Sequence, residues 1–272
     1  MDIYAEVTEF YEGYSGEKIS IGKSVFGHTM YAMKVGKGRP CGLVQAGIHG
    51  REYITAKLCL SQIRQGVSLG SCWFIPLVNP DGALLSQVGL KSVPDAFHQK
   101  KLLEWNGGKR DFSLWKANGQ GVDLNVNFPA RWGKGVKNTR VPGGENYVGT
   151  APLCAPESNA LARFTQKLRP DYTVSYHTKG EEIYWKFGNS THTCPLSKPL
   201  AELLSQCTGY PLKEAEGSVG GFKDWCLETL QIPSFTVEVG QDIFAHPLGE
   251  QALPDIIEKN VDTIDRLSKF WV

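Results

Sequence analysis

The amino-acid sequence predicts an α/β fold: a single domain of three layers (α/β/α), in which helices cover both faces of a mixed, largely parallel central sheet. Two observations lead to this prediction. Short apolar runs rich in β-branched residues alternate along the chain with segments whose apolar residues recur at helical spacing. The length of 272 residues is within the range of one large sheet with its covering helices. We therefore expect residues 1–272 to form one domain.

Five apolar runs have the length and the residue types of strands. They are short, they contain β-branched and aromatic residues, and they end at or next to Gly, Asn or His. In chain order, the predicted strands are residues 29–36, 42–48, 72–79, 171–177 and 234–240.

Five other segments carry apolar residues at the spacing of an amphipathic helix. In chain order, the predicted helices are residues 53–66, 157–169, 197–208, 222–230 and 254–270. Between about residues 81 and 150 the pattern breaks down into Gly, Trp, Asn and charged residues. Because long irregular segments in compact domains are usually functional, we expect this one to line a cleft.

His49 and Glu52 follow directly after the predicted strand 42–48 and lie three residues apart. In a turn that opens into a helix, positions i and i+3 point to the same side, so both side chains can bind one metal ion. Such a pair also arises by chance in many chains, and it becomes specific only with a third ligand and a base.

His177 and Glu238 lie at or near the ends of the predicted strands 171–177 and 234–240. Strand ends are where α/β folds build their sites. Two histidines and one glutamate are a ligand set of catalytic zinc, with water in the fourth position, and a further carboxylate can take the proton of that water. Taken singly, a strand-end histidine is more often a hydrogen-bonded core or surface residue, and a glutamate in an apolar strand more often faces solvent.

The composition excludes several classes of function. With 29 Lys and Arg against 28 Asp and Glu and no basic stripe, we expect no nucleic-acid partner and no anionic membrane. No apolar run is long enough for a transmembrane segment. The N-terminus has no signal-peptide pattern, and seven scattered cysteines without a Cys-x-x-Cys pair are typical of reduced thiols. We therefore expect a cytoplasmic protein.

Five motifs resemble, in the same order and spacing, those of the zinc carboxypeptidases related to pancreatic carboxypeptidase A. The motifs are His49-x-x-Glu52, Asn79-Pro80-Asp81-Gly82, Gly121-Val122-Asp123-Leu124-Asn125, His177 and Thr236-Val237-Glu238. The resemblance covers roughly Ile19 to Trp271 and implies that residues 1–272 are a single zinc peptidase catalytic domain.

The resemblance also implies one zinc ion per chain, bound by His49, Glu52 and His177, and a general base, Glu238, that accepts the proton of the attacking water. In the family, an arginine stabilises the oxyanion formed by this attack. The matching residue here is Lys116, which supplies the positive charge without the fork geometry of a guanidinium.

Two departures from the digestive members concern the substrate. Those enzymes hold the terminal carboxylate of the substrate with an Asn-Arg pair, whereas this chain has Asn125 followed by Val126. Ordinary carboxypeptidase activity is therefore expected to be poor. Lys223 stands where the family recognises the side chain beyond the scissile bond, and a cation there selects an anionic side chain. The alternative is that Lys223 is a surface residue of a helix.

With the segments 115–118, 125–132 and 146–149, these departures make the chain most similar to the bacterial γ-D-glutamyl-meso-diaminopimelate peptidases, which cut cell-wall (murein) peptides. The expected partner is therefore a small peptide from the cell wall. Diaminopimelate ends in both an ammonium and a carboxylate, which would suit Lys223 paired with Asp224 or a nearby acid. The residues expected to bind the substrate are Arg51, Asn125, Arg131 and Lys223.

Two other functions stay open at this point. A metallocarboxypeptidase that removes acidic C-terminal residues would also need a cation at Lys223, but the missing arginine disfavours it. A catalytically inactive, zinc-free binding module on the same fold is disfavoured because all three ligands and Glu238 are present, and a metal assay would decide.

Overall fold

The computed structural model describes residues 1–188, 194–214 and 217–271. Its strands are β1 (Lys18–Lys23), β2 (Thr29–Gly36), β3 (Cys41–Ala46), β4 (Ser71–Ile75), β5 (Tyr172–His177), β6 (Glu182–Tyr184), β7 (Leu212–Lys213) and β8 (Ser234–Glu238). They form one mixed sheet in the order β1-β2-β4-β3-β5-β8-β6-β7. The four central strands, β4, β3, β5 and β8, pair with one another in parallel, whereas β2 joins β4 and β6 joins β8 antiparallel.

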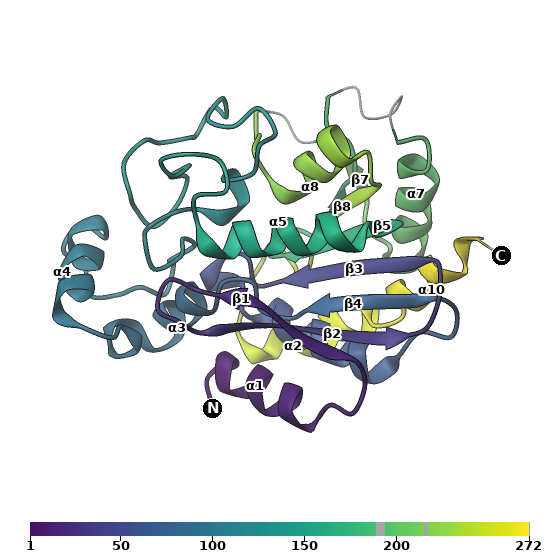
Figure 1. The fold of residues 1–272 in the computed structure, drawn as a ribbon, viewed down its shortest axis with the longest axis horizontal. Coiled ribbons are helices and arrows are strands. Elements are labelled where there is room, and N and C mark those ends of the chain that lie inside the picture. The colour runs from purple at the N-terminus through teal and green to yellow at the C-terminus, as the bar shows by residue number, and fades with distance from the viewer. Residues whose placement is uncertain (189–193, 215–216, 272) are drawn as a thin grey trace.

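Helices lie on both sides of this sheet, and α5 runs along one face of it (Figure 1). The described helices are α1 (Ile3–Gly13), α2 (Ile54–Gln65), α3 (Pro80–Val88), α4 (Ala96–Trp105), α5 (Pro156–Leu168), α7 (Ser197–Thr208), α8 (Phe222–Trp225), α9 (Leu253–Asn260) and α10 (Thr263–Ser268). None of them combines the length and the apolar character that crossing a bilayer requires.

The sheet separates two hydrophobic cores. Successive strand residues point to opposite faces. Val44 of β3 therefore belongs to the core that β3 shares with α1, α2, α7, α9 and α10, while its neighbour Leu43 belongs to the core shared with α5 and α8. Phe74 and Trp73 of β4 divide between the two cores in the same way. All of β3 is buried, as a strand covered on both faces should be. The prediction of a three-layer α/β/α fold is confirmed.

The five predicted strands correspond to β2, β3, β4, β5 and β8, and three of the predicted helices correspond to α2, α5 and α7. The helix predicted at 222–230 is α8 followed by a π-helical turn, Cys226–Leu230. The helix predicted at 254–270 is two helices, α9 and α10. The strands without a prediction, β1, β6 and β7, are short or half-exposed, so they carry no continuous apolar run.

The expectation of an irregular segment from 81 to 150 is wrong for its first part, which contains most of α3 and all of α4. α3 is buried on nearly all sides and α4 is mostly exposed, so neither shows a one-sided apolar stripe. The residues that cap the starts of these two helices were nevertheless recognisable in the sequence. The side chains of Asn79 and Asp95 accept the N–H groups of Gly82 and His98 at the two helix starts.

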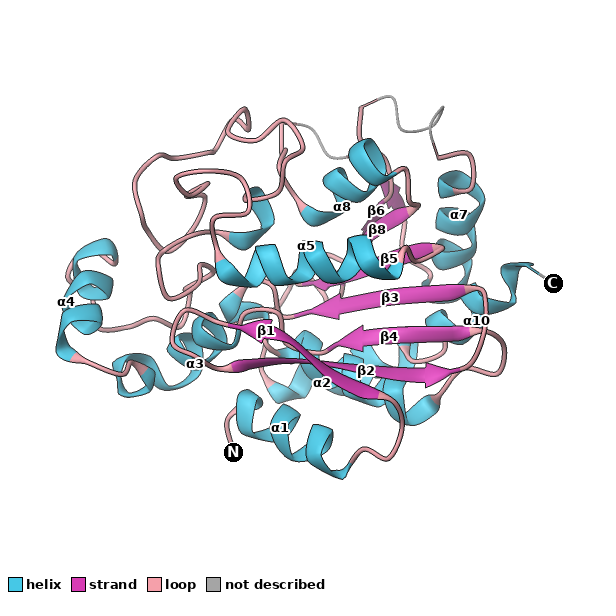
Figure 2. Ribbon diagram, in the orientation of Figure 1, coloured by secondary structure: helices cyan, strands magenta, loops and turns pink. Residues whose placement is uncertain are grey.

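The remaining loops gather beside the carboxyl ends of the central strands. Figure 2 shows the arrowheads of β3 and β4 pointing to the same side of the molecule, towards these loops. Buried side chains replace regular backbone pairing there: Asn118 binds the N–H groups of Gln120 and Val122, and Asn127 donates to the carbonyls of Val148 and Ala151. This side of an α/β sheet is where sites are expected.

Candidate metal centre and active-site cleft

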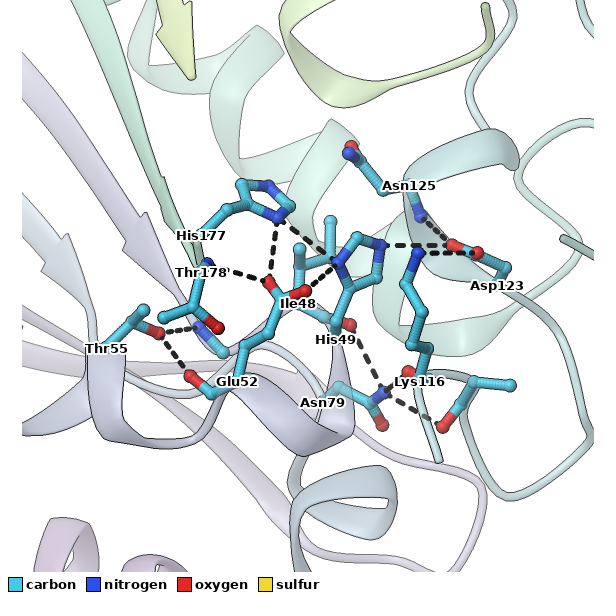
Figure 3. A network of polar contacts seen from close by, with 12 residues as sticks. Ile48, His49, Glu52, Thr55, Asn79, Lys116, Asp123, Asn125, His177 and Thr178 are labelled. Carbon is cyan, nitrogen blue, oxygen red and sulfur yellow. Dashed lines mark hydrogen bonds and ion pairs between the residues drawn. The ribbon is translucent and has the colours of Figure 1, made fainter. Parts of the chain in front are cut away.

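His49, Glu52 and His177 are buried and converge on one point (Figure 3). Nδ1 of each histidine lies 2.9 Å from an oxygen of Glu52, and the two Nδ1 atoms are 3.2 Å apart. One potential ligand atom from each residue lies within 4.8 Å of the other two. The structure therefore brings the three predicted metal ligands together.

Neighbouring parallel strands explain this convergence. β3 and β5 are paired, so their carboxyl ends lie side by side. His49 and Glu52 follow β3 at a single 3-10 turn, Gly50–Glu52, and His177 is the last residue of β5. The Thr55 hydroxyl holds the turn, because it donates to the carbonyl of Glu52 and accepts the N–H of Gly47.

Gly50 allows this turn to pack against two other motifs. Its N–H donates to the carbonyl of Lys116, and the N–H of Arg51 donates to the carbonyl of Trp115, both at 2.9 Å. A Cβ atom on Gly50 would lie 2.4 Å from the carbonyl of Gly82 and 2.8 Å from the carbonyl oxygen of Trp115. A larger residue would therefore push the metal-binding turn away from the segment that carries Lys116.

Asn79 also holds the metal-binding turn and the loop with Lys116 together. Its side-chain Nδ2 lies 3.1–3.2 Å from the carbonyl oxygens of Ile48, Lys116 and Ala117. The Asn-Pro-Asp-Gly motif therefore has a structural role here: it fixes the strand that precedes His49 and the loop that carries Lys116 to one another.

Asp123 orients His49. Its Oδ1 lies 3.3 Å from Nε2 of His49, and its Oδ2 lies 3.8 Å from Nζ of Lys116. The carboxylate also accepts the N–H groups of Asn125 and Asn146. Burial alone would raise the pKa of Asp123, but the charges of Lys116 and His49 hold this pKa well below its usual range. Asp123 is therefore an anion that accepts a hydrogen bond from Nε2–H of His49, which leaves Nδ1 without a proton and directed towards Glu52.

This set of donors fits zinc. With Nε2 of His49 donating to Asp123, Nδ1 presents a lone pair to the point it shares with Glu52 and His177. Burial would raise the pKa of Glu52, but both histidines hold it well below its usual range, so this ligand is anionic. Two imidazole nitrogens and one carboxylate are a common protein ligand set of catalytic zinc. His49, Glu52 and His177 would hold one such ion.

Glu238 is the last residue of β8 and pairs in parallel register with His177. It lines the same cavity as the three metal ligands. Burial raises the pKa of Glu238 to about 7, with Glu52 adding to the effect and His177 and Lys116 opposing it. A carboxylate with a pKa near neutrality can both accept and return a proton.

The metal ligands lie in a cleft that consists of three connected cavities. The central cavity, of about 520 Å³, is lined by the three ligands and Glu238. An arm of about 300 Å³ shares Asn125 and Glu238 with it and contains Lys223. A second arm, of about 500 Å³, shares Arg51 and Lys116 with the central cavity. We call these the Lys223 arm and the Arg51 arm; the metal ligands line the central cavity, which shares residues with both.

Lys223 is buried, which excludes the alternative of a surface lysine. Its Nζ donates to Oδ1 of Asp224 at 2.6 Å and to the carbonyl of Lys186 at 3.1 Å, and lies 5.5 Å from the centre of the Phe187 ring. Asp224 and Glu214 line the same arm. The Lys223 arm therefore offers a cation and two carboxylates to a ligand.

Of the other residues expected to bind substrate, Arg51 and Asn125 line the central cavity. Oδ1 of Asn125 accepts the N–H of Phe222, which leaves its amide N–H groups for a ligand. Arg131 is not brought to the cleft. Its guanidinium pairs with Glu228 at 2.9 Å and stacks on the ring of Phe187 at 4.6 Å, and both contacts hold it elsewhere.

Sequence analysis assigned no role to Asp123 or to His246. The Gly-Val-Asp-Leu-Asn motif contained the signal for Asp123, since its Asp-x-Asn turn follows the segment with Lys116. His246 lies in the loop after β8 and lines the central cavity. No local sequence pattern indicates a role for this histidine, because only the tertiary fold of the loop brings it close to the other residues of the cavity.

The parallel strands, the His-Glu-His group and the facing carboxylate of Glu238 define a zinc peptidase site on an α/β fold. The chain belongs to the zinc carboxypeptidase family, whose model matches residues 3–263.

Curated relatives include two bacterial enzymes. The chain is 33% identical over 249 residues to gamma-D-glutamyl-L-diamino acid endopeptidase 1 of Lysinibacillus sphaericus, covering 85% of this chain and 62% of that protein. It is 29% identical over 215 residues to murein peptide amidase A of Escherichia coli K12, covering 74% of this chain and 71% of that protein. The chain thus spans less than two thirds of the length of the first relative.

A solved structure shows the same fold. Bovine thrombin-activatable fibrinolysis inhibitor superposes with a TM-score of 0.76 at 19% identity, covering 98% of this chain and 96% of that one.

Proposed function

We propose that this chain is a zinc-dependent peptidase that hydrolyses the bond between γ-D-glutamate and meso-diaminopimelate in murein peptides. The observation that carries the proposal is the Lys223 arm, which shares Glu238 with the central cavity and is lined by Glu214 and by a buried lysine paired with Asp224. We also propose that residues 1–272 act as a single catalytic domain with one zinc ion.

The residues of the central cavity suit this hydrolysis. A bound zinc ion would polarise the scissile carbonyl and lower the pKa of a water molecule. Glu238 would accept the proton of the attacking water and return it to the leaving amine, which a pKa of about 7 permits. Lys116 lines the same cavity, and its ammonium would stabilise the negative charge that develops on the carbonyl oxygen.

The Lys223 arm matches the far end of diaminopimelate. That end carries an ammonium and a carboxylate on one carbon. The ammonium of Lys223 would bind the carboxylate, and Asp224 or Glu214 would bind the ammonium, with charge-assisted hydrogen bonds in both cases.

The same arm disfavours a carboxypeptidase that removes acidic residues. A plain acidic side chain would gain Lys223 but would also meet the carboxylate of Asp224, and it has no ammonium of its own to offset this repulsion. Val126 lines the cleft where the digestive enzymes have their carboxylate-binding arginine, so a terminal carboxylate also lacks its clamp.

The test is incubation of the zinc-loaded protein with L-alanyl-γ-D-glutamyl-meso-diaminopimelate, followed by mass spectrometry. We expect free diaminopimelate and L-alanyl-D-glutamate as products, and neither product with Glu238→Gln or after zinc chelation. Shortening of peptides with acidic C-termini, without release of diaminopimelate, would favour the carboxypeptidase instead. A protein that binds no zinc would be a binding module.

A further inference from the structure

The Arg51 arm contains a positive charge that no carboxylate in the described part of the chain neutralises. Among residues 1–188, 194–214 and 217–271, no carboxylate lies within 4.0 Å of the Arg51 guanidinium, and its Nε is buried without a hydrogen-bond partner. The two acids of the metal centre are paired with other residues than Arg51: Glu52 with both histidine ligands, and Asp123 with His49 and Lys116. A buried donor without a partner is costly unless a ligand satisfies it.

His246 is a second side chain in this region with a buried nitrogen that lacks a hydrogen-bond partner among the described residues. It lines the central cavity together with Arg51, and within the described part of the chain its Nδ1 is buried and has no hydrogen-bond partner. Burial lowers the pKa of His246 to about 4; Arg51, Lys179 and Lys116 act in the same direction and Glu52 opposes them. Since Lys179 is paired with Asp242 and Lys116 with Asp123, the excess positive charge beside the imidazole comes chiefly from Arg51.

The position of Arg51 indicates which part of a substrate it meets. Of these three cavities, Lys223 lines the Lys223 arm alone, whereas Arg51 lines the Arg51 arm and the central cavity, where the metal ligands lie. A substrate with its diaminopimelate in the Lys223 arm therefore places its acyl side towards Arg51. Among the residues that the structure describes, Glu145 is the only acid that lines the Arg51 arm; it is exposed, so solvent screens its repulsion of an anion.

The acyl side of a γ-glutamyl bond differs in charge from that of an ordinary peptide bond. A γ-linked glutamate keeps its α-carboxylate free, a short aliphatic chain away from the scissile carbonyl. An α-linked residue has a neutral amide at the corresponding end. A cationic subsite on this side would therefore favour the γ-linkage, which presents one negative charge there, over the α-linkage, which presents none.

We propose that Arg51 and His246 form a carboxylate-binding subsite that recognises the free α-carboxylate of the γ-linked acidic residue on the acyl side of the scissile bond. The assignment of this ligand rests on the proposed function. The guanidinium of Arg51 supplies the charge and its unpartnered Nε–H. Neutral His246, with its one ring proton on Nδ1, donates a hydrogen bond to the same carboxylate. Lys116 remains available for the oxyanion.

The first test measures binding and needs no turnover. N-acetyl-D-glutamate and N-acetyl-D-isoglutamine share the γ-carboxylate and differ only at the α-position, where one has a carboxylate and the other a neutral amide. Calorimetry on the zinc-loaded protein should give N-acetyl-D-glutamate an advantage of roughly ten- to a hundredfold, the usual range for a hydrogen bond to a charged group. Arg51→Gln should abolish the advantage, and His246→Gln should reduce it.

Two controls and a spectroscopic readout accompany this test. Arg163→Gln changes an exposed residue of α5 and His98→Gln a half-buried residue of α4, and both should leave the advantage intact. In NMR titrations, N-acetyl-D-glutamate should raise the pKa of His246, because a carboxylate beside an imidazole stabilises its protonated form. N-acetyl-D-isoglutamine should leave it unchanged. A role of Arg51 in folding alone would not produce this difference.

The second test compares tripeptides that carry γ-D-glutamate or D-isoglutamine before diaminopimelate. The wild-type kcat/KM should favour the acid by the same factor, and Arg51→Gln should equalise the two. Equal binding of the two acetylated compounds to the wild type, or an advantage that survives in Arg51→Gln, would overturn the subsite even if both peptides are cut. If N-acetyl-D-glutamate binds with the Arg51-dependent advantage and neither tripeptide is cut, the subsite is supported and the proposed function fails.

Discussion

His177 and Glu238 are paired partners on the neighbouring parallel strands β5 and β8. The proposed third metal ligand and the proposed general base are therefore held by one ladder of backbone hydrogen bonds rather than by flexible loops. A one-residue slip between these strands would move Glu238 to the opposite face of the sheet. The register of two strands that are far apart in the sequence is thus part of the catalytic geometry.

Glu238→Gln should keep zinc and lose turnover. The amide preserves the shape of the side chain but cannot accept the proton of the attacking water. We expect kcat to fall by at least ~100-fold, since general bases contribute about 10²–10⁴. Steady-state kinetics and metal analysis of the same preparation measure both effects. Turnover near that of the wild type would show that the base is another residue.

Zinc affinity should fall as the pH falls. Burial alone would lower the pKa of His49, but Glu52 and Asp123 raise it above its ordinary value of 6.5, although Lys116 opposes them. Zinc binds the neutral imidazole, so protons compete for His49 below this raised pKa, and the loss begins above pH 6.5. Chelator competition from about pH 8 to about pH 5.5 measures the effect. An affinity that stays constant down to pH 6.5 would contradict the prediction.

Lys223→Gln should impair the cleavage of diaminopimelate peptides selectively. The variant loses a charge-assisted hydrogen bond worth roughly 1.5–3 kcal/mol, which is about ten- to a hundredfold in kcat/KM. A peptide with lysine in place of diaminopimelate has no distal carboxylate and should be affected much less. Lys100→Gln, at an exposed position of α4, is the matched control. An equal loss on both peptides would indicate a disturbed fold instead of lost recognition.

Glu157 should make the stability of the protein depend on pH. The side chain is buried and accepts hydrogen bonds from Asn118 and from the N–H of Val25. Burial, with the nearby Asp81, raises the pKa of Glu157 from 4.5 to about 7. Because the folded state binds this proton more tightly than the unfolded chain does, the stabilisation is complete below about pH 4.5 and is lost as the pH rises through about 7.

Denaturant unfolding of the wild type and of Glu157→Gln over this range tests the effect of Glu157. The destabilisation caused by the substitution should shrink with rising pH, by on the order of 2–3 kcal/mol in total. Glu104→Gln, an exposed position on α4, should show no such trend. A difference that is constant or that grows with pH would contradict the prediction.

The central strands and the metal ligands were predictable from the sequence for one physical reason. β3, β5 and β8 are buried on both faces and therefore carry nearly continuous apolar runs. His49, His177 and Glu238 stand out because each is a polar residue where such a run ends.

Other parts of the site lacked a local signal. α3 and α4 escaped prediction because neither has a one-sided apolar stripe. Arg131 belongs to the segment that resembles the family, yet Glu228, from a distant part of the chain, holds its guanidinium away from the cleft. His246 reaches the central cavity only through the course of the loop after β8. The contacts of long side chains and of loop residues depend on the tertiary structure, so they cannot be predicted from the local sequence.

The most direct test of the account is a competition experiment with the zinc-loaded wild-type protein. Equal amounts of L-alanyl-γ-D-glutamyl-meso-diaminopimelate and of the same tripeptide ending in L-lysine are mixed, and product ratios are followed by mass spectrometry. The account predicts a preference for diaminopimelate of about ten- to a hundredfold, the effect of one charge-assisted hydrogen bond to Lys223. Release of lysine and diaminopimelate at equal rates would contradict it, because the distal carboxylate would then have no partner in the cleft.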